Sequence, residues 1–233
     1  MKFLNYIIWL LFPKRCACCN NLIKREEHLC EDCNKDIEQI TKLCIKCGCD
    51  KKHCCCGRFT YHFRGLVSPF NFGDVSSKGI YILKFGGSTE NADFFAESMA
   101  KTVIENYSNI KFNYILSVPL HPLNKFKRGY NQSEILARKI SKILGVPYVN
   151  YLKKIKRTKP QHKSNFKDRF SNIKDAYVCK NFKANNVLLV DDIKTTGATL
   201  DECARQIMFA GANNVYCVTA LSNYKKQGLK NKE

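Results

Sequence analysis

The cysteines of this chain are concentrated in one short stretch. The chain has 14 cysteines in 233 residues, and all but Cys179, Cys203 and Cys217 lie between Cys16 and Cys56. Such clustering indicates either a disulfide framework or a metal-binding segment, and the redox compartment separates these two readings. A stretch of this size builds little hydrophobic core, so a bound metal would supply much of its folding energy.

The N-terminus bears on the compartment. Residues 3–12 form an apolar run, but Pro13-Lys14-Arg15 follows it in place of a small-residue cleavage site. The run is also shorter than the roughly 20 residues that a membrane-spanning helix needs. We expect a short amphipathic or buried helix that docks on the protein; a membrane-surface contact and a cleaved signal are the alternatives. The expected location is the cytoplasm, without stable membrane insertion, and reduced thiols there favour zinc over disulfides.

The spacing of the cysteines predicts two structural zinc sites. A two-residue gap lets both thiolates of one turn face the same cation, and two such pairs complete a tetrahedral shell. Buried structural cysteines, a redox pair and an iron–sulfur centre are the alternatives. His28, His53 and His62 lie nearby, and any of them could replace a thiolate. The predicted ligands are Cys16, Cys19, Cys30 and Cys33 in the first site, and Cys44, Cys47, Cys54 and Cys56 in the second, whose last pair is irregular.

The rest of the chain alternates apolar strand-like runs with helical patterns. Strands are expected at residues 65–72, 114–118, 187–190 and 214–221, and helices at residues 75–85, 91–107 and 132–144. This alternation predicts an α/β fold with a parallel sheet that helices cover on both faces. We expect a cysteine-rich module at residues 1–60, the α/β domain at residues 61–222 and a basic tail at residues 223–233.

The segment at residues 187–202, VLLVDDIKTTGATLDE, is the most informative one in the α/β domain. A buried strand ends at Val190, two acids follow, and a loop of small and hydroxyl residues leads into a helix. Thr199 and Glu202 have the spacing of a capping box, which predicts the helix start. A helix N-terminus with such a loop suits a phosphate group. The carboxylates of Asp191 and Asp192 would repel phosphate, so they suit sugar hydroxyls or a metal ion held by sugar and phosphate.

This segment resembles the phosphoribosyl pyrophosphate (PRPP) signature of type I phosphoribosyltransferases. The resemblance implies that Asp191 and Asp192 bind the ribose 2′- and 3′-hydroxyls, and that magnesium accompanies PRPP. Lys84 of the sequence Lys84-Phe85-Gly86 resembles part of a pyrophosphate-binding loop, and Arg128 completes the expected site. The residues expected to cradle the 5′-phosphate are Lys194, Thr195, Thr196, Gly197, Ala198 and Thr199.

The whole chain resembles the ComF family, in which a double zinc ribbon precedes a domain like that of the type I phosphoribosyltransferases. The stretches that carry this resemblance are residues 117–121 (SVPLH), 127–132 (KRGYNQ) and 157–161 (RTKPQ), with the later Arg169 and Asn172. The last of these regions is a mobile loop over the site in phosphoribosyltransferases. The sequence departs from the family at residues 54–59, where the last zinc pair is irregular.

The formal net charge of +19 predicts an acidic or phosphate-bearing partner. Residues 150–185 alone carry a balance of +9. This excess over the needs of PRPP, together with interleaved aromatic residues, predicts single-stranded DNA binding; a solvated basic surface is the alternative. The nucleic-acid candidates are Lys153, Lys154, Lys156, Arg157, Lys159 and Lys163.

The family resemblance implies an accessory protein of DNA uptake in natural transformation, which binds PRPP or a related phosphoribosyl ligand. It also implies partners in the competence machinery, such as the ComF helicase. An active phosphoribosyltransferase, which would transfer ribose 5-phosphate from PRPP to an acceptor that the sequence does not identify, is the first alternative. A regulatory binding module without catalysis is the second.

Overall fold

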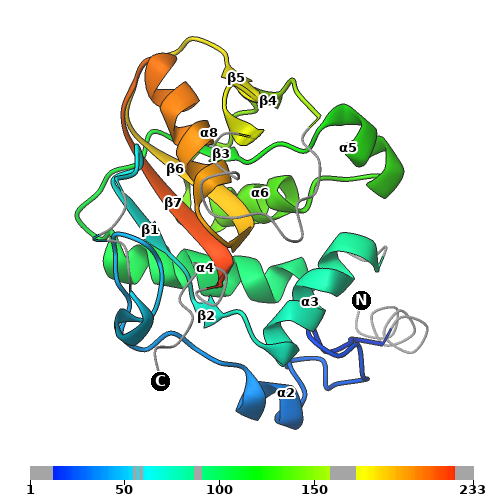
Figure 1. The fold of residues 1–233 in the computed structure, drawn as a ribbon. Coiled ribbons are helices and arrows are strands. Elements are labelled where there is room, and N and C mark those ends of the chain that lie inside the picture. Colours follow the sequence, from blue (N-terminus) through cyan, green and yellow to red (C-terminus); the bar gives the residue numbers. More distant parts are fainter. Residues whose placement is uncertain (1–12, 55–56, 58–59, 87–90, 158–171, 224–233) are drawn as a thin grey trace.

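A parallel sheet forms the centre of the computed structural model, which describes residues 13–54, 57, 60–86, 91–157 and 172–223. The strand order is β1–β7–β6–β3, and β2 also pairs with β7 (Figure 1). All these pairings are parallel, as the strand–helix alternation predicts. The strands are β1 (Gly65–Val67), β2 (Phe70–Asn71), β3 (Tyr114–Ser117), β6 (Ala184–Lys194) and β7 (Ala212–Ser222).

The edge of the sheet is interrupted where the sequence suggests one continuous strand. Between β1 and β2 stand Ser68 and Pro69. Proline has no backbone N–H and is tolerated only at sheet edges and breaks. The expected strand over residues 65–72 is therefore two short strands that pair with successive parts of β7.

Helices cover both faces of the sheet, as expected. Leu188 and Val190 of β6 pack against α3 (Asp74–Phe85), α4 (Ala92–Asn106) and α6 (Gln132–Leu144). Leu189, which points to the opposite face, packs against α8 (Ala198–Phe209). Successive side chains of a strand point to opposite faces, so an unbroken apolar run serves both layers.

A small antiparallel pair of strands lies beyond α8. It consists of β4 (Leu152–Lys154) and β5 (Tyr177–Cys179), and the sequence patterns do not predict it. Both strands have only three residues and alternate between buried and exposed side chains. Leu152 and Tyr177 are buried in the same cluster as the inner face of α8.

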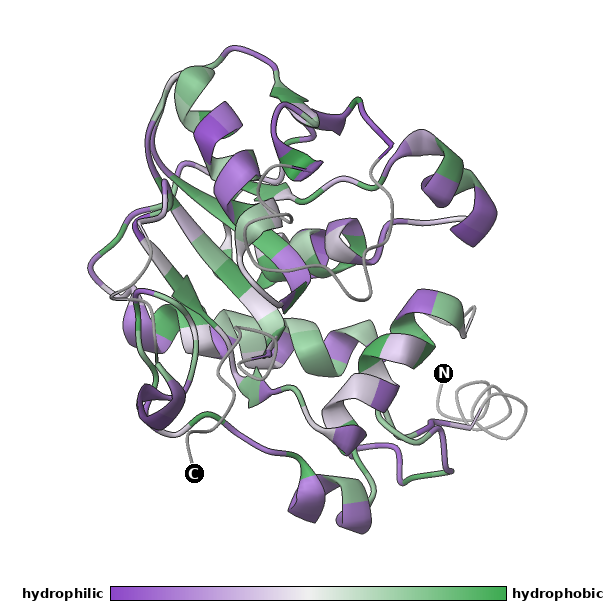
Figure 2. Cartoon of the chain, in the orientation of Figure 1, coloured by the Kyte–Doolittle hydropathy of each residue, from purple (hydrophilic) through white to green (hydrophobic). Residues whose placement is uncertain are grey.

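The cysteine-rich segment packs directly on the α/β domain. It contains α2 (Glu31–Asp36) and the 3-10 helix η1 (Lys51–His53). Ala17, Leu29 and Ile37 are buried in the same cluster as residues of α3 and α4. The figures show α2 beside α3, with a largely hydrophilic surface on α2 and mainly hydrophobic central strands (Figures 1 and 2). The first half of the cysteine-rich segment thus shares the hydrophobic core of the larger domain.

The helix expected at residues 3–12 lies outside the described residues, as does the tail from residue 224. Among the helices that the structure does describe, none has the length and apolar character to cross a membrane.

Candidate functional site

The two acids of the PRPP-like signature lie at the carboxyl end of β6. Asp191 and Asp192 are both buried, with exposed fractions of 9% and 5%. The Ser133 hydroxyl donates a 2.7 Å hydrogen bond to Oδ1 of Asp191, and the Gln132 amide donates a 2.9 Å hydrogen bond to Oδ2 of Asp192. Both donors come from the first turn of α6, so the start of this helix fixes the orientation of the acid pair.

The Lys84 ammonium forms an ion pair with Asp192. Its Nζ lies 2.7 Å from Oδ2 of Asp192, and the lysine side chain is about four-fifths buried. Lys84 lies in the last turn of α3, and residues 87–90, which follow Gly86, are outside the described part. The fold therefore brings the expected pyrophosphate-binding lysine to the acid pair.

Burial raises the pKa of Asp191 to about 7, and the neighbouring Asp192 charge adds to this rise. The hydrogen bond from Ser133 and the Lys84 charge act in the opposite direction, because they favour the ionised carboxylate. Asp191 thus exchanges its proton close to neutral pH. In the ionised state its oxygens are hydrogen-bond acceptors only, as binding of sugar hydroxyls requires.

The sequence KRGYNQ at residues 127–132 forms the turn between α5 (Pro122–Arg128) and α6. Gly129 ends α5 in the left-handed region, with φ of +82°, and Asn131 caps α6 by accepting a hydrogen bond from the Ser133 backbone N–H. The Tyr130 hydroxyl donates to the Leu83 carbonyl of α3. Glycine, tyrosine and asparagine thereby position the donors that follow them.

Arg128 connects this turn to the acid pair through a side-chain relay. Its guanidinium donates a 2.6 Å hydrogen bond to the side-chain oxygen Oε1 of Gln132, and the side-chain amide of Gln132 in turn donates to Asp192. The same guanidinium lies over the Phe85 ring, 4.8 Å from its centroid. Arg128 and Lys84 thus form the cationic side of the candidate site.

The phosphate-loop segment turns sharply between β6 and α8. Gly197 has φ of +85° and is the N-cap of α8, which begins at Ala198. The capping box expected between Thr199 and Glu202 is absent, because the helix starts earlier and Glu202 binds elsewhere. Glu202 accepts hydrogen bonds from the Asp175 backbone N–H and from Arg205. The Thr196 hydroxyl instead accepts a 3.3 Å hydrogen bond from the Ala198 backbone N–H.

Residues that the motifs do not predict hold this loop from the side of the cysteine-rich segment. The Tyr61 hydroxyl donates a 3.3 Å hydrogen bond to the Thr196 carbonyl, and the Tyr61 ring lies against Gly197. His62 donates from its backbone N–H to the buried carboxylate of Asp201 in α8. Neither contact follows from local sequence, because about 135 residues separate the partners.

Lys194 is placed differently from the other expected ligand residues. Only 1% of its surface is exposed, and its Nζ lies 3.1 Å from the Sγ atom of Cys49, which in turn lies 3.3 Å from the Ser222 hydroxyl. The Lys194 side chain therefore lies in the interior, between β6 and the cysteine-rich segment. Lys84 contacts the acid pair directly, and Arg128 reaches it through Gln132. The other expected ligand residues lie along the end of β6, the turn and the start of α8: Asp191, Asp192, Thr195, Thr196, Gly197, Ala198 and Thr199.

The first cysteine cluster has the geometry of a four-thiolate metal site. The Sγ atoms of Cys16, Cys19, Cys30 and Cys33 all lie within 4.8 Å of one another, and those of Cys19 and Cys30 are 3.6 Å apart. A tetrahedral zinc ion with Zn–S bonds of about 2.3 Å requires sulfur–sulfur separations close to the 3.6 Å between Cys19 and Cys30. The residues fit a structural zinc ion, which would have no open coordination position for substrate.

The second cluster brings together three of its four expected ligands. The Sγ atoms of Cys44, Cys47 and Cys54 lie within 4.8 Å of one another. The expected fourth ligand, Cys56, lies outside the described residues. Two of the nearby histidines face carboxylates: His28 contacts Glu97, and His62 contacts Asp201. Among the described residues, both metal-competent clusters consist of cysteines alone.

The nucleic-acid candidates differ in accessibility. Lys153, Lys156 and Arg157 are exposed, whereas Lys154 is partly buried and lies over the Tyr177 ring, 5.3 Å from its centroid. Burial lowers the pKa of Lys154. Lys159 and Lys163 are outside the described residues. A cavity of about 400 Å³ connects Lys153 and Lys154 with Lys125 of α5.

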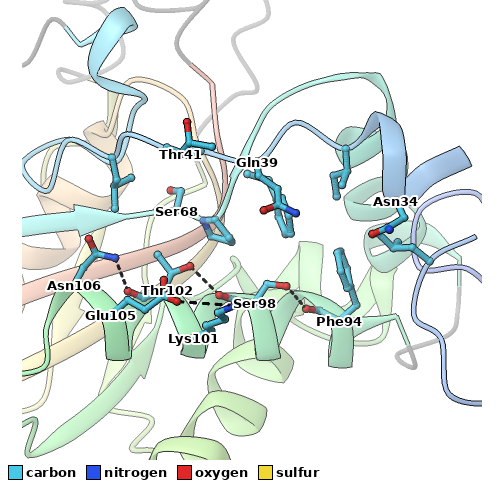
Figure 3. Close-up of a pocket in the computed structure, with 16 residues that line it drawn as sticks. Asn34, Gln39, Thr41, Ser68, Phe94, Ser98, Lys101, Thr102, Glu105 and Asn106 are labelled. Carbon is cyan, nitrogen blue, oxygen red and sulfur yellow. Dashed lines mark hydrogen bonds and ion pairs between the residues drawn. The ribbon is translucent and has the colours of Figure 1, made fainter. Parts of the chain in front are cut away.

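Another cavity lies away from these sites, between α2 and α4, and has a volume of about 530 Å³ (Figure 3). The polar side chains that α4 contributes include Ser98 and Thr102, which form hydrogen bonds within the helix. The Ser98 hydroxyl donates to the Phe94 carbonyl, and the Thr102 hydroxyl donates to the Ser98 carbonyl. The geometry of this cavity indicates no particular ligand.

Comparison with known proteins places the site in context. Residues 130–233 match the phosphoribosyl transferase domain. The chain is 29% identical to Competence protein F of Haemophilus influenzae, over 92% of this chain and 96% of that protein. It is 26% identical to Competence protein ComFC of Bacillus subtilis, over 82% of each chain, and 26% identical to DNA utilization protein YhgH of Escherichia coli K12, over 82% of this chain and 89% of that protein.

Among solved structures, a purine phosphoribosyltransferase from Pyrococcus horikoshii matches 55% of this chain and 71% of its own, with 22% identity and a TM-score of 0.33. An adenine phosphoribosyltransferase matches 64% of this chain and 78% of its own, with 15% identity and a TM-score of 0.40.

Proposed function

Because this chain belongs to the ComF family and carries a phosphoribosyltransferase-type domain, we propose that it binds PRPP or a related phosphoribosyl ligand and single-stranded DNA during natural transformation. The observation that carries the ligand half is the buried pair Asp191 and Asp192 beside the left-handed turn at Gly197. We place this activity in the cytoplasm, where incoming DNA is single-stranded and thiols are reduced. The ComF helicase stays a predicted partner, on the family resemblance alone.

In the proposed complex each part of the site contacts a different part of the ligand. The loop at residues 195–199 and the N-terminus of α8 direct backbone N–H groups at the 5′-phosphate, because a helix start carries unpaired donors and a positive dipole end. The carboxylates of Asp191 and Asp192 accept hydrogen bonds from the ribose hydroxyls. Lys84 and Arg128 provide positive charge for the pyrophosphate group.

Magnesium and zinc have separate roles in this proposal. The carboxylates and the ligand's own oxygens are the donors that Mg²⁺ prefers, so the site suits a magnesium–PRPP complex. When bound, the ion would neutralise pyrophosphate charge. The two cysteine clusters suit zinc, whose role would be to stabilise the cysteine-rich segment.

The DNA half of the proposal rests on the exposed cations near β4. Lys153, Lys156 and Arg157 are exposed and follow one another closely along the chain. Cations in such an arrangement bind a phosphate backbone and give a strong dependence on salt concentration. Lys154 is less suited to this contact, because its ammonium faces the Tyr177 ring.

Isothermal titration of the zinc-loaded protein with PRPP and Mg²⁺ tests the ligand half. We expect binding by the wild type and none by the Asp191→Asn/Asp192→Asn double variant, which keeps side-chain size. Asp32→Asn/Asp36→Asn on α2 is the matched control, because both acids are exposed and lie away from the phosphate loop. Absence of binding by folded wild-type protein, or equal affinity of the two double variants, would refute this assignment.

Fluorescence anisotropy with a labelled single-stranded oligonucleotide tests the DNA half. We expect Lys153→Glu/Lys156→Glu to weaken binding and to reduce the slope of affinity against salt concentration. Lys142→Glu/Lys183→Glu reverses two exposed lysines elsewhere and is the control. Equal affinities of the two double variants would remove the DNA surface from residues 153–157.

A further inference from the structure

A cavity with aromatic walls lies where the second cysteine cluster meets the edge of the sheet. Its volume is about 680 Å³, within the usual range for small-molecule sites. Tyr61 and Phe63 form one wall as a stacked pair, with ring centroids 4.6 Å apart and an angle of 14° between the planes. Tyr107 and Tyr216 form another, with centroids 5.1 Å apart. Rings on two sides of a cavity suit a flat, unsaturated ligand.

The hydroxyl of Tyr107 in this wall lacks a hydrogen-bond partner among the described residues. The side chain is 95% buried, since its exposed fraction is 5%, and burial raises its pKa. The hydroxyl lies beside Gly65, where an added Cβ atom would come within 2.8 Å of it. This hydroxyl is itself enclosed by protein, so the cavity presents the ring and not the hydroxyl of Tyr107 to a ligand.

The rim of the cavity carries positive charge without opposing acids. Lys46, Lys51 and Arg64 line it and are exposed, and its described lining contains no aspartate or glutamate. Arg64 is held by a 3.0 Å hydrogen bond from Nε to the Asn214 side-chain oxygen. Stacking surfaces together with surrounding cations are the combination by which proteins bind single-stranded nucleic acids.

We propose that this cavity receives a base of single-stranded DNA, whose flanking phosphates contact Lys46, Lys51 and Arg64. This inference rests on the DNA half of the proposed function and adds a second contact region to it. Tyr61 is common to both sites, because its ring lines the cavity and its hydroxyl contacts the phosphate loop at Thr196. The strand would therefore reach the protein beside the phosphoribosyl site.

The test compares an oligothymidylate with an abasic strand of equal length by anisotropy at fixed salt concentration. Ile45→Trp fills the cavity mouth at a half-exposed position, and Ile104→Trp on α4 is the matched control, since the two isoleucines are 50% and 54% exposed. Stacking of one base contributes about 1–3 kcal/mol, so we expect Ile45→Trp to weaken oligothymidylate binding by about 5- to 150-fold. Ile104→Trp should bind oligothymidylate as wild type does. Neither substitution should change binding of the abasic strand.

The unfolding temperature separates loss of binding from loss of folding. Ile45 is half exposed, so Ile45→Trp should unfold at the wild-type temperature while it weakens oligothymidylate binding. A misfolded protein cannot give that combination.

Three results would overturn the inference. The first is equal binding of oligothymidylate by Ile45→Trp and Ile104→Trp, and the second is equal binding of the abasic and normal strands by wild type. The third is binding of free thymidine monophosphate without binding of the strand. If wild type binds neither strand, the DNA half of the proposed function fails as well. If wild type binds DNA and Ile45→Trp binds it equally well, the cavity inference fails and the DNA half survives.

Discussion

Replacement of Gly197 by alanine probes the geometry on which the phosphate loop depends. The residue has φ of +85°, in the left-handed region, where a side chain costs about 1–2 kcal/mol. The new Cβ would also lie 3.2 Å from Cε1 of Tyr61, closer than ordinary van der Waals contact. Either the loop keeps its shape and the protein loses that free energy of folding, or the loop relaxes and loses its alignment toward phosphate.

Gly145 provides the matched control for this substitution. It ends α6 with φ of +65°, and an added Cβ would meet no atom within 4 Å. Both alanine variants should lose about 1–2 kcal/mol of unfolding free energy in urea titrations. Only Gly197→Ala should also weaken PRPP binding in isothermal titration, by about 2- to 10-fold, because displacement of Tyr61 breaks its hydrogen bond to Thr196.

The two alanine variants separate a local effect on the loop from general destabilisation. If Gly197→Ala has the same unfolding free energy and the same PRPP affinity as wild type, the turn is not left-handed in solution and the phosphate-loop geometry is wrong. If Gly145→Ala weakens binding equally, the effect arises from general destabilisation and not from the contact with Tyr61.

Three further predictions follow from the site and the clusters. Lys194→Met should leave PRPP affinity unchanged within about twofold in titration calorimetry, whereas Lys84→Met should weaken it strongly, because only Lys84 faces the acid pair. PRPP affinity should rise as pH increases through about 7, because Asp191 ionises there, and Asp191→Asn should retain only the pH dependence of the ligand. The same raised pKa means that folding stability falls as pH rises from about 4 to 7. The unfolding temperature of wild type, compared with that of Asp191→Asn, should therefore decrease over this pH range. Zinc chelation should lower the unfolding temperature and expose apolar surface to a hydrophobic dye, since Cys16 and Cys33 share the core of α3 and α4; an unchanged transition would contradict a structural role for the metal.

The elements around the phosphate loop are predictable because their signals are local. A four-residue apolar run, two acids and a small-residue loop predict the order of β6, turn and α8. The helix at residues 132–144 is predicted with correct bounds because Asn131 caps it and Gly145 ends it in the left-handed region. In each case a few neighbouring residues determine the backbone conformation.

The supports of the site are not predictable in the same way, because they depend on residues far apart in sequence. Gln132 and Ser133 bind acids that lie 60 and 58 positions further along the chain. The spacing of Thr199 and Glu202 satisfies a local capping pattern, yet Glu202 binds Asp175 and Arg205 instead. Tertiary partners therefore decide between locally equivalent arrangements, and only the packing of α6 and α8 on the sheet identifies them.

The cysteine-rich segment and the phosphate loop form one structural unit, although sequence alone suggests separate modules. Cys49 contacts both Lys194 at the end of β6 and Ser222 at the end of β7. Tyr61 holds the far side of the loop at Thr196. Tyr61 is the contact that holds the loop, whereas the contact between Cys49 and Lys194 joins the segment to the end of β6. Tyr61 follows the second cysteine cluster in sequence, so metal binding at that cluster would order the residue that holds the loop. A structural metal at this cluster would thus act on ligand binding through the position of the loop and not through contact with the ligand.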